Sequence, residues 1–171
     1  RYKGELRINN NWYYFDETTG AMATGWTTHH NKRYYYDEEG HMLHGFQVVD
    51  GKKYYFKAGS EYAYEALSFD IDLDEIGIMC TGYRVIDHKL YYFAPDGVCQ
   101  GICGPKDGWY NANGTWYFMR GGKVSTGIAS VNGADYMFAD NGRMYANTIA
   151  KTENNSLRYV NADGIVVTTR G

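Results

Sequence analysis

The sequence predicts an all-β fold, an elongated β-solenoid of stacked β-hairpins with little or no helix. One motif recurs with a period of about 20 residues, which marks a repeat architecture, and it is clearest from Gly25 to Gly45 in GWTTHHNKRYYYDEEGHMLHG. Each copy has the pattern of two short strands joined by turn residues. A single hairpin is marginally stable in water, so the copies must stack to bury their aromatic rings.

The aromatic runs place the copies along the chain. They predict a single repeat domain over residues 1–171 with about seven hairpins, and insertions into the connections near residues 57–78 and 99–109. The runs lie at residues 12–15, 34–36, 54–56, 91–93, 116–118 and 136–138, with a degenerate copy at 158–160.

Pairs of turn residues separate the two strands of each copy. Asp50-Gly51 and Asn132-Gly133 are typical of tight two-residue hairpin turns, because both pairs accept the positive φ angles that such turns need. His30 and Asn31 take the same place in the clearest copy. The pair Asn113-Gly114 lies one residue closer to its aromatic run, which predicts a shifted register or a different loop in that hairpin.

Composition excludes several classes of function. Aromatic residues make up 17% of the chain, with 18 tyrosines and 21 glycines, and the net charge of -3 gives no reason to expect a nucleic acid partner. No apolar stretch approaches the length of a membrane span and no signal peptide is evident, so membrane insertion is not expected. The chain starts within a repeat, which suggests a piece of a longer protein. Cys80, Cys99 and Cys103 are expected to be small buried residues, and a bridge between the first two stays open.

The repeats resemble a known family. The segment NNWYYFDETTGAMATGW, from Asn10 to Trp26, is similar to the choline-binding repeats of Gram-positive surface proteins. The segments GFQVVDGKKYYF and GYRVIDHKLYYF are more similar to the repeats of clostridial toxins and of glucan-binding domains. This resemblance to the cell-wall-binding repeat family covers nearly the whole chain except the two insertions. It implies a left-handed solenoid that holds ligands between successive repeats.

The resemblance implies a choline site in the first copy. The family's aromatic cage falls on Trp12, Tyr14, Met22 and Trp26, with Tyr35 from the second copy. A quaternary ammonium group makes no hydrogen bonds and is held by aromatic faces.

Later copies depart from this pattern, because the position of Trp12 is taken by Arg33, Lys53, Leu90, Thr115, Asp135 and Leu157. A fixed cation repels choline, whereas cations, carboxylates and aromatic floors together suit a sugar. The candidate sugar floors are Trp26 with Tyr35, Phe46 with Tyr55, and Tyr83 with Tyr92. The alternative is that these tyrosine-rich strands only pack the protein.

No metal or catalytic site is expected. Asp70, Asp72 and Asp74 alternate as in calcium loops, but glycine and glutamate are missing where an EF-hand needs them, which favours a solvated acidic loop. His29, His30, His41 and His44 are expected to be solvated. No nucleophile or phosphate-binding motif occurs, and no cofactor is predicted.

The sequence therefore predicts a non-catalytic module that anchors a secreted or cell-surface Gram-positive protein to glycan through aromatic grooves. The alternatives are a module that recognises choline on teichoic acid and a structural spacer or protein-interaction solenoid, with an enzyme least favoured. Unpaired terminal hairpins also allow a homodimer that forms through the solenoid ends.

Overall fold

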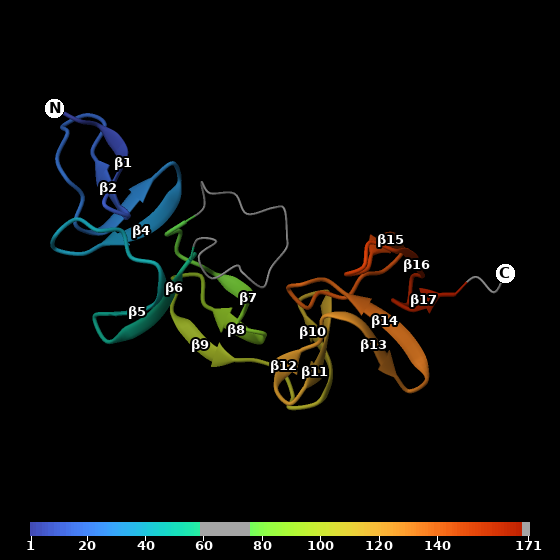
Figure 1. The fold of residues 1–171 in the computed structure, drawn as a ribbon. Helices are drawn as coiled ribbons and strands as arrows, with labels where there is room; N and C mark the ends of the chain where they lie inside the picture. The colour runs from blue at the N-terminus through green and yellow to red at the C-terminus, as the bar shows by residue number, and fades with distance from the viewer. Residues whose placement is uncertain (59–75, 169–171) are drawn as a thin grey trace. The chain divides into compact units, whose positions relative to one another are not determined.

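The structure is a computed structural model that describes residues 1–58 and 76–168. Within these ranges the regular structure consists of strands, which form seven small antiparallel sheets (Figure 1). The strands are β1 (Gly4–Ile8), β2 (Asn11–Phe15), β3 (Gly25–His29), β4 (Lys32–Tyr36), β5 (Gly45–Val49), β6 (Lys52–Phe56), β7 (Gly82–Ile86), β8 (Lys89–Phe93), β9 (Cys99–Ile102), β10 (Gly108–Ala112), β11 (Thr115–Arg120), β12 (Lys123–Val124), β13 (Gly127–Val131), β14 (Ala134–Phe138), β15 (Thr148–Lys151), β16 (Leu157–Val160) and β17 (Val166–Val167).

Tight turns close most of the hairpins as predicted. Asp50 and Gly51 have φ angles of 50° and 75°, and His30 and Asn31 have φ angles of 50° and 59°. Positive φ at both central residues gives the turn a twist that matches the flanking strands. The last hairpin differs, because Lys151 pairs with Leu157 and leaves a five-residue loop between them.

The fifth hairpin keeps the same turn but shifts its aromatic run. Asn111 pairs with Trp116 in β10–β11, just as Thr28 pairs with Arg33 in β3–β4. Trp116, and not the predicted Thr115, therefore takes the position of Arg33. The cause is the turn at Asn113-Gly114. Because the turn ends at Gly114, β11 begins at Thr115, one residue before the aromatic run at residues 116–118.

A recurring backbone bond joins successive hairpins. The N–H of Met42 donates to the carbonyl of Trp12 at 2.8 Å, and Met79 donates in the same way to Arg33 at 2.8 Å. Further along, the N–H of Met144 donates to the carbonyl of Trp116 at 2.9 Å. We call the connection that follows a hairpin its corner. The corner is thus hydrogen-bonded to the second strand of the preceding hairpin.

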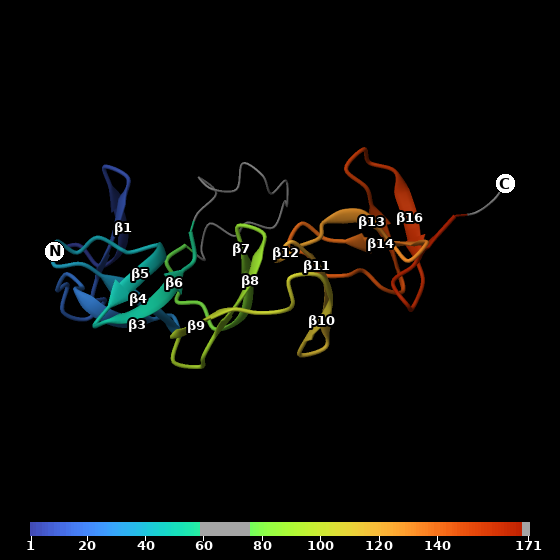
Figure 2. The same cartoon turned by 90° about the horizontal axis from the view of Figure 1, so that it is seen from below.

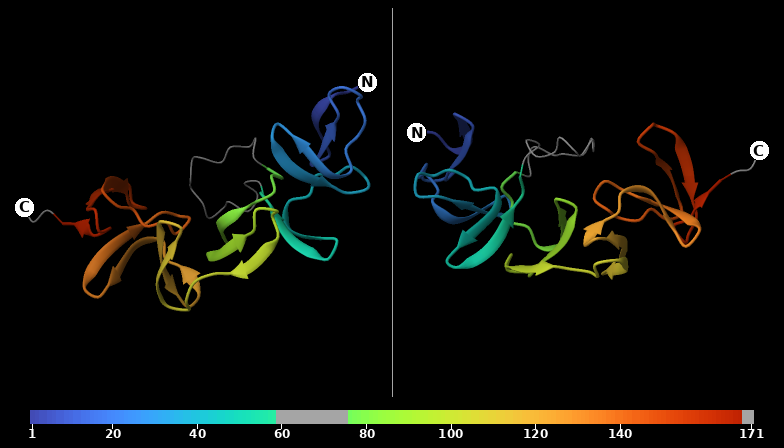
Figure 3. Two further views of the ribbon diagram at one scale, coloured as in Figure 1. Left: turned by 180° about the vertical axis from the view of Figure 1, so that it is seen from behind. Right: turned by 60° about the horizontal axis from the view of Figure 1, so that its bottom comes forward.

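The chain divides into two compact units. Unit 1 comprises Arg1–Gly82 and Phe93–Cys99, and unit 2 comprises Tyr83–Tyr92 and Gln100–Gly171. Figure 2 shows β3 to β6 of unit 1 from below, and Figure 3 shows β13 and β14 of unit 2 from two further sides. The core of unit 1 is built from rings that include Tyr34, Tyr36, Tyr54 and Phe56, all 8% exposed or less.

The larger insertion begins within an ordinary corner. The N–H of Lys57 donates to the carbonyl of Ile78 at 2.8 Å, and the N–H of Gly77 donates to Lys57 at 2.7 Å. The same two bonds close the corner at Asp37, Gly40 and His41. The acidic residues Asp70, Asp72 and Asp74 lie outside the described residues, so the prediction for that loop is not tested.

The predicted fold class is confirmed by these features. Each unit is all-β, and within each unit the hairpins stack in chain order over the ranges that the structure describes. Three short strands, β9, β12 and β17, add to hairpins as third strands and were not predicted. Of the cysteines, Cys80 is buried and Cys99 and Cys103 are half-buried. No helix in residues 1–58 or 76–168 is long and apolar enough to cross a membrane.

Candidate functional site

The strands of each hairpin present two different faces. Side chains alternate across a strand, so in β4 Tyr34 and Tyr36 enter the core at 4% and 1% exposure while Arg33 and Tyr35 lie on the other face. Trp26 of β3 pairs with Tyr35 and shares that second face. We call the second face of each hairpin its groove face, because it meets the next hairpin.

The first aromatic group lies in unit 1 and centres on Trp26. Its ring centroid is 5.1 Å from that of Tyr35 and 4.9 Å from that of Tyr54 in the following hairpin, both edge to face. The Arg33 guanidinium carbon lies 4.2 Å from the Trp26 ring centroid. A cation of the protein therefore covers one face of the half-buried indole.

The second group repeats this design one hairpin later. The rings of Phe46 and Tyr55 lie 4.8 Å apart, and Phe93 lies 6.4 Å from Phe46. The Lys53 ammonium nitrogen is 4.2 Å from the Phe46 ring centroid. The predicted pairs Trp26 with Tyr35 and Phe46 with Tyr55 are thus brought together, each with a cation on its aromatic ring.

A third group lies in unit 2. Tyr83 and Tyr92 have ring centroids 4.9 Å apart, as predicted for a pair, and Tyr110 is 6.5 Å from Tyr83. A hydrogen bond with Tyr83, together with burial, raises the pKa of the Tyr110 hydroxyl to about 12. This group offers phenol hydroxyls beside its rings rather than a cation.

Trp109 is the centre of a fourth group that was not predicted from the sequence. Its ring centroid lies 5.0 Å from Phe118, 4.8 Å from Tyr136 and 6.3 Å from Trp116. The two indoles are nearly perpendicular, at 88°, and Trp116 is 43% exposed. The signal that reveals this group is the turn at Asn113-Gly114, which fixes the register and moves Trp116 onto the groove face.

The groups around Trp26 and Trp109 are equivalent. Each tryptophan follows the glycine that opens its hairpin, and each meets a tyrosine of the next hairpin at 4.9 or 4.8 Å. They differ at one position, where the first group has Arg33 and the second has Trp116. The first group therefore presents a fixed charge and the second presents aromatic faces.

The five side chains predicted to form the first-copy cage are divided between neighbouring clusters. Tyr14 is 8% exposed and packs with Tyr34 and Tyr36, whereas Trp26 and Tyr35 pack around Tyr54 and Phe56. Trp12 is half-buried, with the Arg7 guanidinium carbon 5.8 Å from its ring centroid. Met22 is 42% exposed, and its sulfur lies against Gly40 of the next corner.

His29 contradicts the prediction of solvated histidines. It is 6% exposed, and its ring stacks between Tyr14 and Tyr34 with centroid distances of 4.0 Å on both sides. Burial lowers the pKa of His29 to about 4, with a further contribution from His30. His29 ends β3 on the core face, at the position that Val49 takes in β5 and Ala112 takes in β10, which is the signal that was overlooked.

Two family models match the chain. The choline-binding repeat model matches residues 23–64, and the cell wall binding repeat model matches residues 6–22 and 107–121. The second model thus covers the segment that carries Trp109 and Trp116.

Three similar proteins come from streptococci. Glucosyltransferase-S of Streptococcus mutans is 30% identical over 94% of this chain and 10% of its own length. Choline binding protein F of Streptococcus pneumoniae is 30% identical, with a TM-score of 0.46, over 98% of this chain and 47% of that structure. The choline-binding domain of another Streptococcus pneumoniae protein is 35% identical, with a TM-score of 0.34, over 38% of this chain and 98% of that domain. The chain thus spans about a tenth of the length of the glucosyltransferase it matches.

Stacked hairpins that hold half-buried rings at fixed positions define a repeat-type binding module. The repeats at residues 6–64 and 107–121 belong to the choline-binding and cell wall binding repeats.

Proposed function

We propose that the chain is a non-catalytic module that anchors a larger secreted or cell-surface protein to glycan. The observation that carries this proposal is the ring pair with a cation on it, which occurs at the same position around Trp26 and around Phe46. A sugar has an apolar ring face that stacks on an aromatic side chain and hydroxyls that accept hydrogen bonds from a cationic donor. Choline is disfavoured at both groups, because Arg33 and Lys53 would repel its charge.

The similar proteins support a cell-wall or glucan polymer as the class of ligand. One is named as a glucosyltransferase and another was solved with a peptidoglycan analogue. The parent protein of the chain is proposed to be associated with the Gram-positive cell wall, since the matching relatives are streptococcal.

Removal of the lysine charge tests the glycan proposal. Lys53→Met keeps a long apolar stem over the Phe46 ring but removes the donor, so affinity for short α-glucans and cell-wall oligosaccharides should fall several-fold in titration calorimetry. Lys52→Met is the matched control, because Lys52 is the exposed neighbour in β6 and points to the other face. Equal affinity of both variants and the wild type, or no binding by a folded wild type across a glycan array, would favour the structural-spacer alternative.

Choline is the second candidate, at the Trp109 group only. The perpendicular indoles of Trp109 and Trp116, with Tyr136 at 4.8 Å from Trp109, present aromatic faces in the way a quaternary ammonium requires. Retention on a choline-bearing resin, with release by free choline, would support this site. Trp116→Ala should abolish retention while Trp12→Ala leaves it intact, and the reverse pattern would favour the first-copy cage.

A homodimer is proposed to form through the last hairpin. Ile149 and Leu157 are 66% and 62% exposed on β15 and β16. A second copy of the chain would bury this apolar surface. Light scattering during size-exclusion chromatography should show a dimer for the wild type and a monomer for Ile149→Asp.

A further inference from the structure

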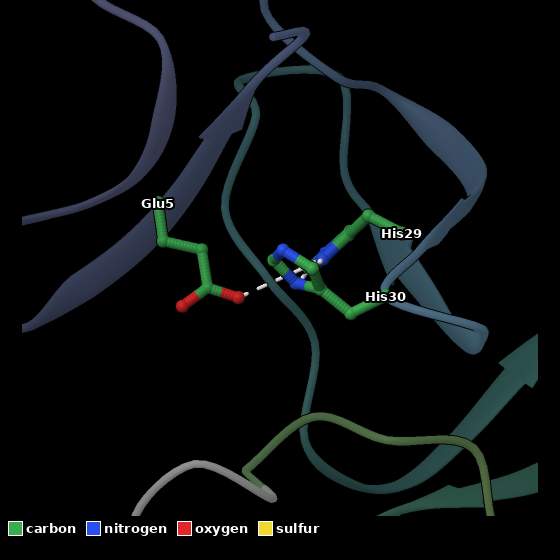
Figure 4. Close-up of side chains that lie close together, drawn as sticks. All are labelled: Glu5, His29 and His30. Carbon is green, nitrogen blue, oxygen red and sulfur yellow. Dashed lines mark hydrogen bonds and ion pairs between the residues drawn. The ribbon is translucent and has the colours of Figure 1, made fainter.

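A polar cluster lies where the first hairpin meets the second in unit 1. Glu5 comes from β1, His29 ends β3, and His30 begins the turn that follows (Figure 4). The Nδ1 atoms of His29 and His30 lie 3.4 Å apart, and Nδ1 of His29 lies 3.6 Å from a carboxylate oxygen of Glu5. The three potential ligand atoms all lie within 4.8 Å of one another.

The cluster departs from the repeat pattern at two positions together. Glu5 pairs with Tyr14 in the way that Trp26 pairs with Tyr35, so it takes the place of an aromatic ring. His29 takes the place of buried Val49. Both changes occur at the same junction between hairpins, and each introduces a residue type that binds metal ions.

The ring of His29 is held in one orientation. Tyr14 and Tyr34 stack on its two faces with interplanar angles of 7° and 3°, and its Nε2 atom lies 3.0 Å from the Tyr36 hydroxyl oxygen. A hydrogen bond from Nε2–H to Tyr36 leaves the lone pair on Nδ1, directed toward Glu5 and His30. Metal-binding histidines use their second nitrogen in this way.

The spacing fits a transition-metal ion. Two ligand atoms that each bind zinc at about 2.0–2.1 Å with tetrahedral angles lie about 3.4 Å apart. The observed separations of 3.4 Å and 3.6 Å are close to this value before any adjustment. The other nitrogen of His30 lies 3.7 Å from a carboxylate oxygen of Glu17, which can orient that ring in the same way.

We propose that Glu5, His29 and His30 form a binding site for a divalent transition-metal ion such as zinc, which ties the first hairpin to the second. Two imidazoles and one carboxylate are a common zinc ligand set that leaves a position for water. Glu5 and His30 are exposed, so an ion would have access from solvent.

A second cluster in the same unit fits this role less well. Asp37, Glu39 and His41 also lie close together, but they offer one imidazole, and its Nδ1 already forms a 3.0 Å contact with the Asp37 carboxylate. The same carboxylate accepts a hydrogen bond from the His41 N–H at 2.7 Å. These contacts stabilise the corner itself, so this cluster serves as an internal control.

Calorimetric titration of the full metal-free chain with zinc chloride tests the proposal. One zinc per chain should bind to the wild type, and Glu5→Gln and His30→Asn should each weaken binding at least tenfold. Asparagine retains the turn, because it accepts the positive φ of 50° found at His30. His44→Asn removes an exposed histidine outside both clusters and should bind zinc as the wild type does.

Two further readouts separate the site from adventitious binding. Zinc should shift the Nδ1 resonance of His29 in long-range ¹H–¹⁵N NMR spectra while Nε2 stays protonated, and it should raise the melting temperature of the wild type but not of His30→Asn. Tyr36→Phe should weaken zinc binding 10–100-fold, because it removes the hydrogen bond that holds Nε2 of His29. Absence of zinc binding, unchanged affinity in Glu5→Gln and His30→Asn, or loss of binding in His41→Asn would each overturn the proposal.

Discussion

At the scale of single residues, His29 shows how one side chain can be misjudged from composition. Histidine is intermediate in its tendency to be buried, and His29 lies on the core face between two tyrosine rings. Its position in the repeat carried more information than its type, because Val49, Ala112 and Val131 are all buried at the corresponding position.

The lowered pKa of His29 predicts a pH-dependent stability. Its pKa of about 4 in the folded state lies below its ordinary value of 6.5. Between these values the unfolded chain binds a proton that the folded chain does not, so stability is complete above pH 6.5 and falls as the pH drops toward 4. Urea unfolding with a chelator present should show this loss in the wild type. The pH dependence should be shallower in His29→Phe over the same range, and parallel curves would contradict the assignment.

A single exchange should transfer choline recognition between hairpins. Arg33 and Trp116 take the same position on the groove face beside Trp26 and Trp109. Arg33→Trp replaces a cation with an aromatic face, which contributes about 0.5–2 kcal/mol to binding of a quaternary ammonium. In a Trp116→Ala background, Arg33→Trp should restore retention on a choline resin. Arg33→Ala in that background is the control, and it should not restore retention.

At the scale of elements, the hairpins were predictable because turn chemistry and strand alternation are local. Asp50-Gly51 and Asn132-Gly133 define their turns from the sequence alone. The third strands β9, β12 and β17 were not predictable, because corner segments form them by backbone pairing that leaves no side-chain pattern. The backbone bond from Met79 to Arg33 also leaves no such pattern, since any residue except proline can donate it.

The candidate site was partly predictable for the same reason. The pairs Trp26 with Tyr35, Phe46 with Tyr55 and Tyr83 with Tyr92 follow from hairpin register, which the turn determines. Contacts between hairpins, such as Tyr54 on Trp26, depend on how the hairpins stack. Their geometry came only from the structure.

The packing of a corner glycine against the methionine of the preceding corner predicts how much stability a substitution of that glycine removes. A Cβ atom on Gly97 would lie 2.4 Å from the sulfur of Met79, whereas a Cβ atom on Gly51 would meet nothing within 4 Å. Both glycines have positive φ, so alanine costs about 1–2 kcal/mol of backbone strain at either position. Gly97→Ala adds overpacking of about 1–3 kcal/mol. Thermal unfolding should therefore show a larger loss for Gly97→Ala, and equal losses would mean that the close packing contributes nothing.

At the scale of the whole molecule, the proposed anchoring to glycan would depend on several weak groups acting on one polymer. Unit 1 carries the Phe46 group and unit 2 carries the Tyr83 group. Once one group holds a polymer, the others meet it at a raised effective concentration, so the total affinity exceeds that of any single group. A short oligosaccharide that fills one group gains nothing from the others.

Multivalent binding predicts a different response to polymer and to oligosaccharide. Phe46→Ala and Tyr83→Ala should each weaken retention in gels that contain a glucan or cell-wall polymer by about tenfold or more, given the 10²–10⁴ range of multivalent gains. The double variant should lose most of the retention. In calorimetry with a trisaccharide, each single variant should lose binding only at the altered group and should keep the wild-type affinity at the other group. Lys52→Ala, which alters an exposed side chain on the other face of β6, is the control for general effects of substitution. If polymer retention fell no further than trisaccharide affinity, the groups would act independently, and anchoring would have to come from one strong site.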